Sequence, residues 1–285
     1  MSSFLKEYSR QAKLYIDLPS QGHYYDDKET LKDKQYTSIP VFGMNAMDEI
    51  TFKTPDALFS GQAVASILES CIPLINDPWK LIKTDLEYIL NAIRLASIGN
   101  TIDMSSTCSV CGTENTVEIE LQSVLSHYDQ IPHKSEFTYK DLIITLRPIT
   151  FKQMSQLGIE LYQKQRTLYQ LQSAEMSQDE KVKQATTVSQ EVVNLTTKTL
   201  VQYIVSVANG SDAEYDNKKI NDFINQNDSE ISKLFLAEIT KFVDIISYPS
   251  LQVQCAGELE SGENCTNKYS VTYNSDYSSF FGNLL

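Results

Sequence analysis

The chain has 285 residues, enough for one large domain or two of ordinary size, and with 41% apolar residues it can bury a core. Its formal net charge is −13, which excludes nucleic acid as an expected partner because a phosphate backbone would be repelled. Anionic membrane surfaces are excluded on the same ground. We expect no leader, because the first residues contain no apolar segment. We also expect no membrane span, because no stretch approaches about 18 apolar residues.

Residues 1–53 are expected to form an irregular N-terminal arm. Turn-forming residues in Leu18–Tyr25 and a charged run in Lys28–Gln35 both favour loop structure. Ile39–Phe42 is apolar, but Pro40 cannot donate a hydrogen bond to a sheet. This segment is therefore predicted to be an edge strand.

Residues 54–150 are expected to begin with a helical hairpin. The first helix is predicted from an N-terminal cap at Thr54–Asp56 to Pro73, because apolar residues recur between them at three- and four-residue spacing. The second helix is predicted from a cap at Thr84–Asp85 to Gly99–Asn100, which is a good helix C-terminus. The first of two cysteine hairpins should follow directly.

This first hairpin contains Cys108 and Cys111, with Gly112 directly after them. The pair interrupts a run with strand-like alternation, so a strand is predicted on each side of the turn. Glycine permits the left-handed conformation that such a turn needs at its end. Beyond the hairpin we expect a linker from Leu121 and then a strand pair that stops at Pro148.

Residues 151–248 are predicted to form a helical insertion. Thr150–Gln153 resembles a capping box, and Ser177–Glu180 restarts a helix. The predicted helices occupy residues 151–176, 177–208, 220–224 and 230–239. Their polar surface indicates a helical bundle in which residues 155–208 form an exposed, elongated hairpin.

Residues 249–285 are expected to hold the second cysteine hairpin and a C-terminal tail. Cys255 and Cys265 again interrupt alternating residues, although they are further apart than in a compact knuckle. The tail ends with several large apolar residues in Phe280–Leu285, which would be costly to leave in water. It is predicted to dock on the domain or to contact another protein.

Four thiolates from these two turns could form one tetrahedral zinc site in the reducing cytosol that the lack of a leader implies. The predicted ligands are Cys108, Cys111, Cys255 and Cys265. Such a site would be closed and structural, and the middle of the chain would be an insertion between the halves of one small module. Two alternatives stay open. The cysteines only pack in a β-module that has lost its metal, or they form a redox dithiol, although no thioredoxin-like context surrounds Cys108.

No recognised catalytic motif occurs in the sequence: there is no nucleophile elbow, P-loop, dinucleotide-binding glycine pattern or zinc-protease motif. The carboxylates are scattered. His23, His127 and His133 are interpreted as surface loop residues, or as a source of a substitute ligand if one cysteine is not used. We therefore expect no enzyme, and a metal-dependent hydrolase is the least favoured class.

Two further residues lie on the predicted helices of residues 54–99. Cys71 is on an apolar helix face and is predicted to be a core residue, not a ligand. Arg94 interrupts an otherwise apolar face. It is either a surface arginine or a partly buried one that pairs with an acid such as Asp56 or Asp85 and fixes the helical hairpin.

Several short segments between residues 15 and 125 carry a recognisable pattern. They are Leu18–Gly22, Met44–Glu49, Thr54–Leu58, Gly61–Val64, Glu69–Pro73, Asp77–Trp79, Asp85–Leu90, Ala92–Asn100 and Cys108–Gly112. Together they resemble a family of baseplate proteins of contractile-tailed phages of the T-even type, which is tied to the central baseplate hub. The resemblance implies a virion or virion-assembly protein with other baseplate hub proteins as partners.

We therefore expect an α+β fold that is mainly helical, with a zinc-ribbon-like β-module formed from the two sequence-distant cysteine hairpins. The expected function is that of a non-enzymatic hub component, alone or as an oligomer, that scaffolds baseplate assembly through protein contacts. It would act in the virion tail baseplate and, during assembly, in the host cytoplasm. The alternative is a transient hub-assembly chaperone, absent from the mature virion, that binds partners through helices 151–208 and the C-terminal tail.

Overall fold

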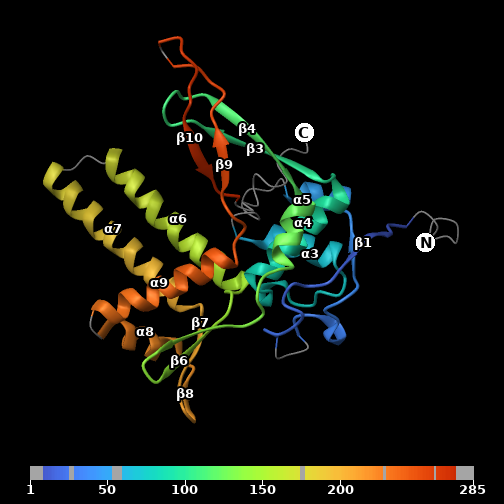
Figure 1. Cartoon of the computed structure of the whole chain (residues 1–285), viewed down its shortest axis with the longest axis horizontal. Coiled ribbons are helices and arrows are strands. Elements are labelled where there is room, and N and C mark those ends of the chain that lie inside the picture. The colour runs from blue at the N-terminus through green and yellow to red at the C-terminus, as the bar shows by residue number, and fades with distance from the viewer. Residues whose placement is uncertain are drawn as a thin grey trace. The chain divides into compact units, whose positions relative to one another are not determined.

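The computed structural model describes residues 9–25, 29–52, 60–173, 177–226, 229–259 and 261–273. They form two compact units, each with helices and small antiparallel sheets, so the expected mixture of α and β structure is confirmed (Figure 1). Unit 1 takes its described residues from 1–78, 84–131 and 246–285, and unit 2 takes them from 79–83 and 132–245. Unit 1 is thus built from both ends of the chain.

The N-terminal part of unit 1 contains a two-stranded antiparallel sheet of β1 (Ala12–Ile16) and β2 (Ile39–Phe42). Pro40 lies within β2, and the edge strand predicted there is confirmed. The expectation of an irregular arm is wrong for β1 and for the short helix α1 (Ala46–Phe52). Segments of five and seven residues carry too little periodicity to be recognised in the sequence.

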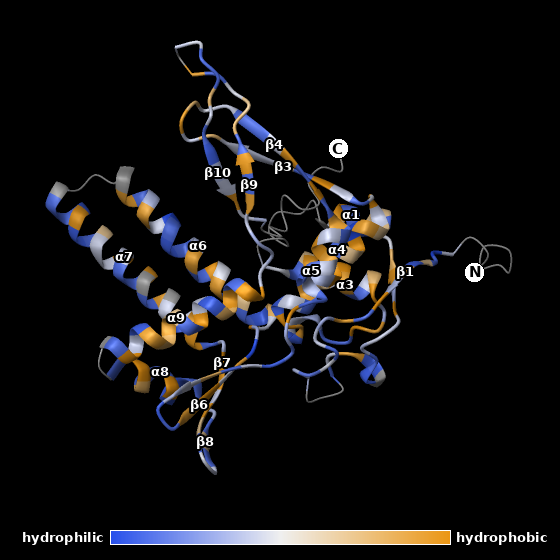
Figure 2. Cartoon of the chain, in the orientation of Figure 1, coloured by the Kyte–Doolittle hydropathy of each residue, from blue (hydrophilic) through white to orange (hydrophobic). Residues whose placement is uncertain are grey.

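The helical hairpin of unit 1 consists of α3 (Gln62–Cys71) and α4 (Lys83–Ser97). The predicted cap at Thr54–Asp56 lies outside the described residues, and α3 begins after Gly61, which has a left-handed φ of 77°. α4 agrees with its prediction, and most of its residues are buried. Figure 2 shows apolar residues concentrated on both helices, which therefore supply much of the core of unit 1. Two 3₁₀ helices, η2 (Lys32–Lys34) and η3 (Pro78–Lys80), occur in the connections between β1 and β2 and between α3 and α4.

Both cysteine hairpins form as predicted. β3 (Thr101–Thr107) pairs with β4 (Glu114–Glu120), and β9 (Leu251–Gln254) pairs with β10 (Lys268–Val271), each in antiparallel register. The two hairpins lie side by side within unit 1 (Figure 1). Segments from distant parts of the chain thus meet in one β-module.

The segment after β4, expected to be a linker, is instead the helix α5 (Leu121–Tyr128). Its buried residues Leu121, Val124 and Tyr128 follow three- and four-residue spacing, so one face packs into unit 1. Tyr128 also donates a hydrogen bond of 2.7 Å to Glu87 of α4. A helix this short has too few apolar repeats to be distinguished from a loop by sequence alone.

Unit 2 contains a four-stranded antiparallel sheet in the order β5-β6-β7-β8. The strands are β5 (Ser135–Tyr139), β6 (Leu142–Leu146), β7 (Ile204–Asn209) and β8 (Asp212–Glu214). The prediction of a helix that continues to Ala208 is wrong, because the helix ends at Val201 and the next residues pair with β6. The β-branched residues of β7 favour a strand once a partner strand is available.

Two helices, α8 (Asn217–Gln226) and α9 (Ser229–Ile245), complete unit 2 and match the predicted helices in that region. Phe235 of α9 is fully buried, and its ring meets Phe137 of β5 edge-on with 5.2 Å between centroids. The aromatic contact joins α9 to the sheet.

The long helices α6 (Phe151–Ser173) and α7 (Gln178–Val201) form a helical hairpin in unit 2 (Figure 1). Both begin at capping boxes, Thr150 with Gln153 and Ser177 with Glu180. Buried and half-buried positions of α6 recur at the three- and four-residue spacing of a coiled-coil seam. They are Met154, Leu157, Leu161, Lys164, Leu168 and Leu171. In Figure 2, apolar and hydrophilic residues correspondingly alternate around both helices.

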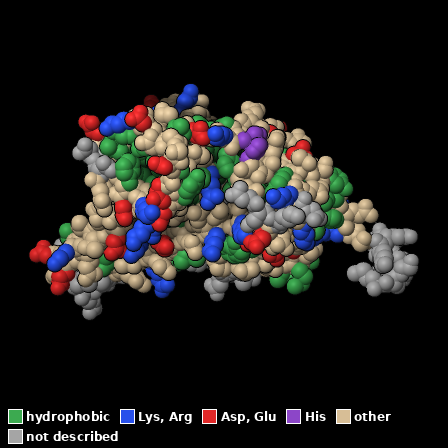
Figure 3. Space-filling model, turned by 90° about the horizontal axis from the view of Figure 1, so that it is seen from below, with side chains coloured by type: hydrophobic (Ala, Val, Ile, Leu, Met, Phe, Trp, Pro, Cys, Tyr) green, Lys and Arg blue, Asp and Glu red, His purple; other side chains and the backbone are tan. Residues whose placement is uncertain are grey.

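The surface of the described residues carries charges of both signs. On the face shown in Figure 3, acidic and basic side chains lie interspersed over the molecule. This agrees with acidity that is spread along the sequence. Among the helices within the described ranges, none combines the length and the apolar character needed to cross a membrane.

Candidate metal centre

The four cysteines predicted as ligands come together between the two hairpins of unit 1. Their Sγ atoms all lie within 4.8 Å of one another. The distances across the hairpins are 3.4 Å from Cys111 Sγ to Cys255 Sγ and 3.9 Å from Cys108 Sγ to Cys265 Sγ. Three of these residues are buried and Cys111 is half-buried, so the cluster is largely closed to solvent.

The first turn is shaped by backbone hydrogen bonds around Cys108. The N–H of Gly112 donates to the carbonyl of Cys108 at 2.9 Å, and the N–H of Cys108 donates to the carbonyl of Thr113 at 2.9 Å. Gly112 has a φ of 71°, a left-handed conformation that would strain other residues. The turn therefore brings Cys108 and Cys111 to the same point.

The second turn reaches the cluster despite the long loop between Cys255 and Cys265. The N–H of Cys265 donates to the carbonyl of Gly257 at 2.8 Å, and the N–H of Cys255 donates to the carbonyl of Asn267 at 2.9 Å. A Cβ at Gly257 would lie only 2.0 Å from Thr113 Oγ1. The close approach of the two turns therefore requires glycine at this position.

Several N–H groups point at the sulfur atoms. The side-chain amide of Asn267 donates to Cys108 Sγ at 3.3 Å, and that of Asn115 donates to Cys255 Sγ at 3.5 Å. The backbone N–H of Gly257 also donates to Cys255 Sγ, at 3.3 Å. Such donors favour the thiolate over the thiol, which is the form that binds a metal.

The thiol pKa values diverge within the cluster. The amide of Asn267, followed by backbone N–H groups of the turn, lowers the pKa of Cys108 to about 6, and Thr113 lowers the pKa of Cys111. The backbone N–H of Asn267 also favours the thiolate of Cys265, but burial and hydrogen bonds with the other thiols raise its pKa to about 12. Four thiols this close together cannot all ionise unless a cation offsets their charge.

The cluster fits a structural zinc ion in donor chemistry and spacing. Zinc–sulfur bonds of about 2.3 Å in a tetrahedron give sulfur–sulfur edges of about 3.8 Å, close to both cross-hairpin distances. A disulfide needs about 2.0 Å, and all five cysteines are free thiols. Four sulfur donors suit zinc far better than calcium or magnesium, and a site closed by four protein ligands has no open position for catalysis.

The three histidines lie apart from the described metal-ligand cluster. His127 is on α5, not in a loop as expected, and its Nε2 lies 3.0 Å from the carbonyl oxygen of Ser247. Its ring packs edge-on against Tyr248 with 5.4 Å between centroids. His127 therefore fixes the segment that leads into the second cysteine hairpin.

Cys71 and Arg94 are both buried in unit 1. The prediction of Cys71 as a core residue is confirmed, and burial raises its pKa to about 12. The proposed pairing of Arg94 with Asp85 is wrong, because the described hydrogen bonds to Asp85 come from residues of the N-terminal arm. Burial lowers the pKa of Arg94, and the charges of Tyr273 and Asp103 oppose that shift. The other proposed partner, Asp56, lies outside the described residues.

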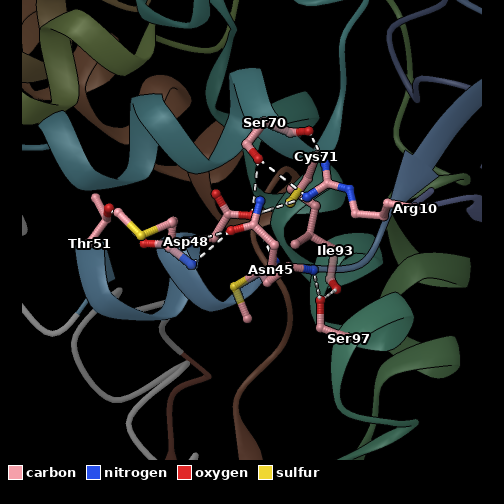
Figure 4. A network of polar contacts seen from close by, with 10 residues as sticks. Arg10, Asn45, Asp48, Thr51, Ser70, Cys71, Ile93 and Ser97 are labelled. Atoms are coloured by element: carbon pink, nitrogen blue, oxygen red, sulfur yellow. Dashed lines mark hydrogen bonds and ion pairs between the residues drawn. The ribbon is translucent and has the colours of Figure 1, made fainter. Parts of the chain in front are cut away.

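A polar network not identified from the sequence joins three elements of unit 1 (Figure 4). Asp48 of α1 accepts hydrogen bonds from Arg10 at 3.2 Å and from Ser70 Oγ at 3.0 Å. The backbone N–H of Asn45 donates to the same carboxylate at 2.9 Å, and Asn45 Oδ1 accepts from the N–H of Asp48 at 3.0 Å. Arg10 also donates to the carbonyl of Ser70. The capping-box spacing of Asn45 and Asp48 is the signal that could have revealed this site.

Replacing Asp48 with alanine is expected to destabilise unit 1 by about 2–4 kcal/mol, because Arg10 and the amide of Asn45 would lose their acceptor. Chemical denaturation followed by circular dichroism measures the change. Ser70→Ala is the comparison variant: it removes the hydroxyl that donates to Asp48 at 3.0 Å and accepts from Arg10 at 3.3 Å. It keeps the carboxylate and its ion pair with Arg10, so it should cost less, about 1–2 kcal/mol. Equal losses in the two variants would contradict a central role for the carboxylate.

A model of the family described as T4 bacteriophage base plate protein matches residues 32–282 of the chain. The match includes the whole cysteine cluster and most of both units. The chain therefore belongs to this family of phage baseplate proteins, and the resemblance noted in the sequence is confirmed. Membership implies interaction with other phage baseplate proteins and a place in the virion tail. No curated protein and no solved structure matches the chain.

Proposed function

We propose that the chain is a structural, non-enzymatic component of the baseplate hub that scaffolds tail baseplate assembly through protein–protein contacts. The cysteine cluster carries this proposal. It brings together Cys108 and Cys265, which flank unit 2 in the sequence, and so closes a β-module from distant segments. A module of this kind supplies a rigid base from which other parts of the chain can contact partners.

Zinc is the ion we assign to the cluster, with Cys108, Cys111, Cys255 and Cys265 as its ligands. When bound, it would offset the charge of four thiolates and hold the two turns in one geometry. The residues around it exclude water and direct N–H groups at the sulfurs. The donor set supports a structural role, because it leaves no position for a substrate.

Exposed aromatic side chains on α6 support a role in protein contacts. Tyr162 is 48% exposed and Tyr169 is 74% exposed. They lie seven residues apart, so they share one side of the helix. Tyrosine is enriched at protein interfaces because it combines apolar area with a polar tip. The seam residues of α6 are already buried or half-buried, which favours a scaffold over a chaperone that shields partners with its apolar stripe.

Quantitative mass spectrometry of purified phage particles and of the infected-cell lysate tests the proposal. We expect a fixed copy number per particle, as a structural subunit requires. Phage that carry Cys108→Ser should contain fewer copies, whereas phage that carry the control substitution Cys71→Ala should keep the parent number. Presence in the lysate together with absence from particles would overturn the structural role and support a transient assembly chaperone.

A further inference from the structure

Each cysteine hairpin supplies one asparagine whose amide donates to a sulfur of the opposite hairpin. Asn115 belongs to β4 in the first hairpin and donates to Cys255 in the second, at 3.5 Å. Asn267 directly precedes β10 in the second hairpin and donates to Cys108 in the first, at 3.3 Å. The arrangement is reciprocal, although the two hairpins have no common spacing of cysteines and asparagine.

The amide of Asn115 is held in one orientation by its other contacts. Its Oδ1 accepts from the N–H of Ala256 at 2.9 Å, while its Nδ2 donates to the carbonyl of Thr113 at 3.1 Å and to Tyr269 Oη at 3.2 Å. Only 7% of Asn115 is exposed. These partners come from both hairpins, so a reversed amide would lose bonds on both sides. The two hydrogens of Nδ2 are shared among Thr113, Tyr269 and, at 3.5 Å, Cys255 Sγ, which keeps the amide nitrogen on the side of the sulfur.

Asn267 joins the hairpins through its backbone and its side chain together. Its carbonyl accepts from the N–H of Cys255 at 2.9 Å, within its own hairpin. Its side-chain amide donates to Cys108 Sγ of the opposite hairpin at 3.3 Å. The position of the Asn267 amide is therefore tied to the position of a cysteine backbone on the same turn.

We propose that Asn115 and Asn267 are positioning residues of the metal centre, which set its affinity and the electron donation of two of its sulfurs. This inference rests on the proposed zinc site. Four thiolates around a divalent cation leave an excess of negative charge, and N–H donors that reach the sulfurs disperse it. Outer partners of metal ligands typically change affinity by about 10- to 100-fold when they are replaced.

The test uses the full-length variants Asn115→Asp and Asn267→Asp, which keep the side-chain shape but replace the N–H donor with a carboxylate oxygen. Zinc affinity is measured by competition with a chromophoric chelator, and the sulfur-to-metal charge-transfer band is measured after substitution with cobalt(II). We expect a loss of affinity of about 10- to 100-fold in each variant. The charge-transfer band should move to lower energy because the sulfurs become stronger donors, a shift that a purely structural role would not produce.

Gln252→Met is the matched control, because Gln252 lies in the same module and donates to Ser270 Oγ at 2.7 Å, away from the sulfurs. It should leave affinity and spectrum unchanged. If Asn115→Asp fails to fold, Asn267→Asp carries the test, since Asn267 is only half-buried. Affinities within twofold of the parent together with an unmoved cobalt band would overturn the role of the asparagines alone. A parent protein that binds neither zinc nor cobalt would overturn the metal centre itself and this inference with it.

Discussion

Extraction of zinc with a strong chelator is expected to open the β-module of unit 1 and to leave unit 2 folded. Binding of structural zinc to thiolate sites contributes on the order of 10 kcal/mol to folding, which is as much as the net stability of a typical domain. The hairpins β3–β4 and β9–β10 meet at the four cysteines, so they should lose most from extraction. Protein purified without added metal should contain about one zinc per chain by elemental analysis.

Hydrogen exchange of the backbone amides locates the effect. After chelation, the amides of both hairpins should exchange faster, whereas those of the sheet β5-β6-β7-β8 in unit 2 should keep their protection. The substitution Cys108→Ser should reproduce this pattern and lower the zinc content. Cys71→Ala removes a buried cysteine that is not part of the cluster, so it should lower stability through packing while the zinc content stays at the parent value.

Two results would count against a structural metal. Protein that contains no zinc, and whose hairpins exchange equally fast with and without chelator, would mean that the cysteines only pack together. Loss of zinc from Cys71→Ala to the same degree as from Cys108→Ser would mean that metal content reports general unfolding. The first result would leave the β-module to be held by contacts such as that between Ser106 Oγ and Tyr269 Oη, at 2.9 Å.

The sequence predicts the cysteine module well because its signals are local and chemical. A pair of cysteines followed by Gly112 specifies a turn with two sulfurs on one side, and alternating residues on both sides specify the strands. Structural zinc is bound by four ligands, and each hairpin offers only two cysteines. For this reason the sequence predicts that the second pair of cysteines joins the first. Gly257 and Gly262 indicate that the long loop can return the second sulfur to the site, but the backbone hydrogen bond from Cys265 to Gly257 that does so could not be predicted from the sequence.

The elements that the sequence analysis missed depend on partners far away in the chain. β7 begins shortly after α7 ends, and its apolar residues fit the helical spacing of α7. It can be recognised as a strand only from its pairing with β6. α5 is recognisable only through burial of one face against the rest of unit 1. Tertiary contacts decide both cases, because local propensity is a weak preference in short segments.

The polar partners around buried groups were missed for a related reason. Asn115 and Asn267 look like ordinary turn residues in the sequence, where asparagine is common. Their roles appear only when the opposite hairpin is in place, at 3.5 Å and 3.3 Å from a sulfur. Arg94 is a similar case: the sequence leaves open whether it is a surface or a buried arginine, and only the fold shows that it is buried.

A fully buried carboxylate, Asp85, anchors the N-terminal arm to the first turn of α4. It accepts hydrogen bonds from the backbone N–H of Ser20 at 3.0 Å, from Ser20 Oγ at 2.5 Å and from Tyr25 Oη at 2.8 Å. Burial raises its pKa to about 6, although these hydrogen bonds oppose the shift. Its place near the N-terminus of a helix also favours negative charge there.

Replacing Asp85 with alanine is expected to cost about 3–5 kcal/mol, because the buried donors of Ser20 and Tyr25 would lose their acceptor. Asp85→Asn keeps the size of the side chain and should cost less at neutral pH. Burial also raises the pKa of other acids such as Asp129, so they add their own pH dependence to the stability. The difference in stability between the parent and Asp85→Asn removes their contribution and reports the titration of Asp85 alone. Urea denaturation at several pH values measures both effects.

The sign of the pH dependence follows from the raised pKa. In the unfolded chain the Asp85 carboxyl loses its proton near pH 4, whereas in the folded protein it keeps the proton until about pH 6. Between these values the folded state binds more protons, so the stability of the parent relative to Asp85→Asn should fall as pH rises, by at most about 1.4 kcal/mol per pH unit. Above about pH 6 the difference should level off. A stability difference that rises with pH between 4 and 6 would mean that the folded protein favours the charged carboxylate, and that hydrogen bonds from Ser20 and Tyr25 outweigh its burial.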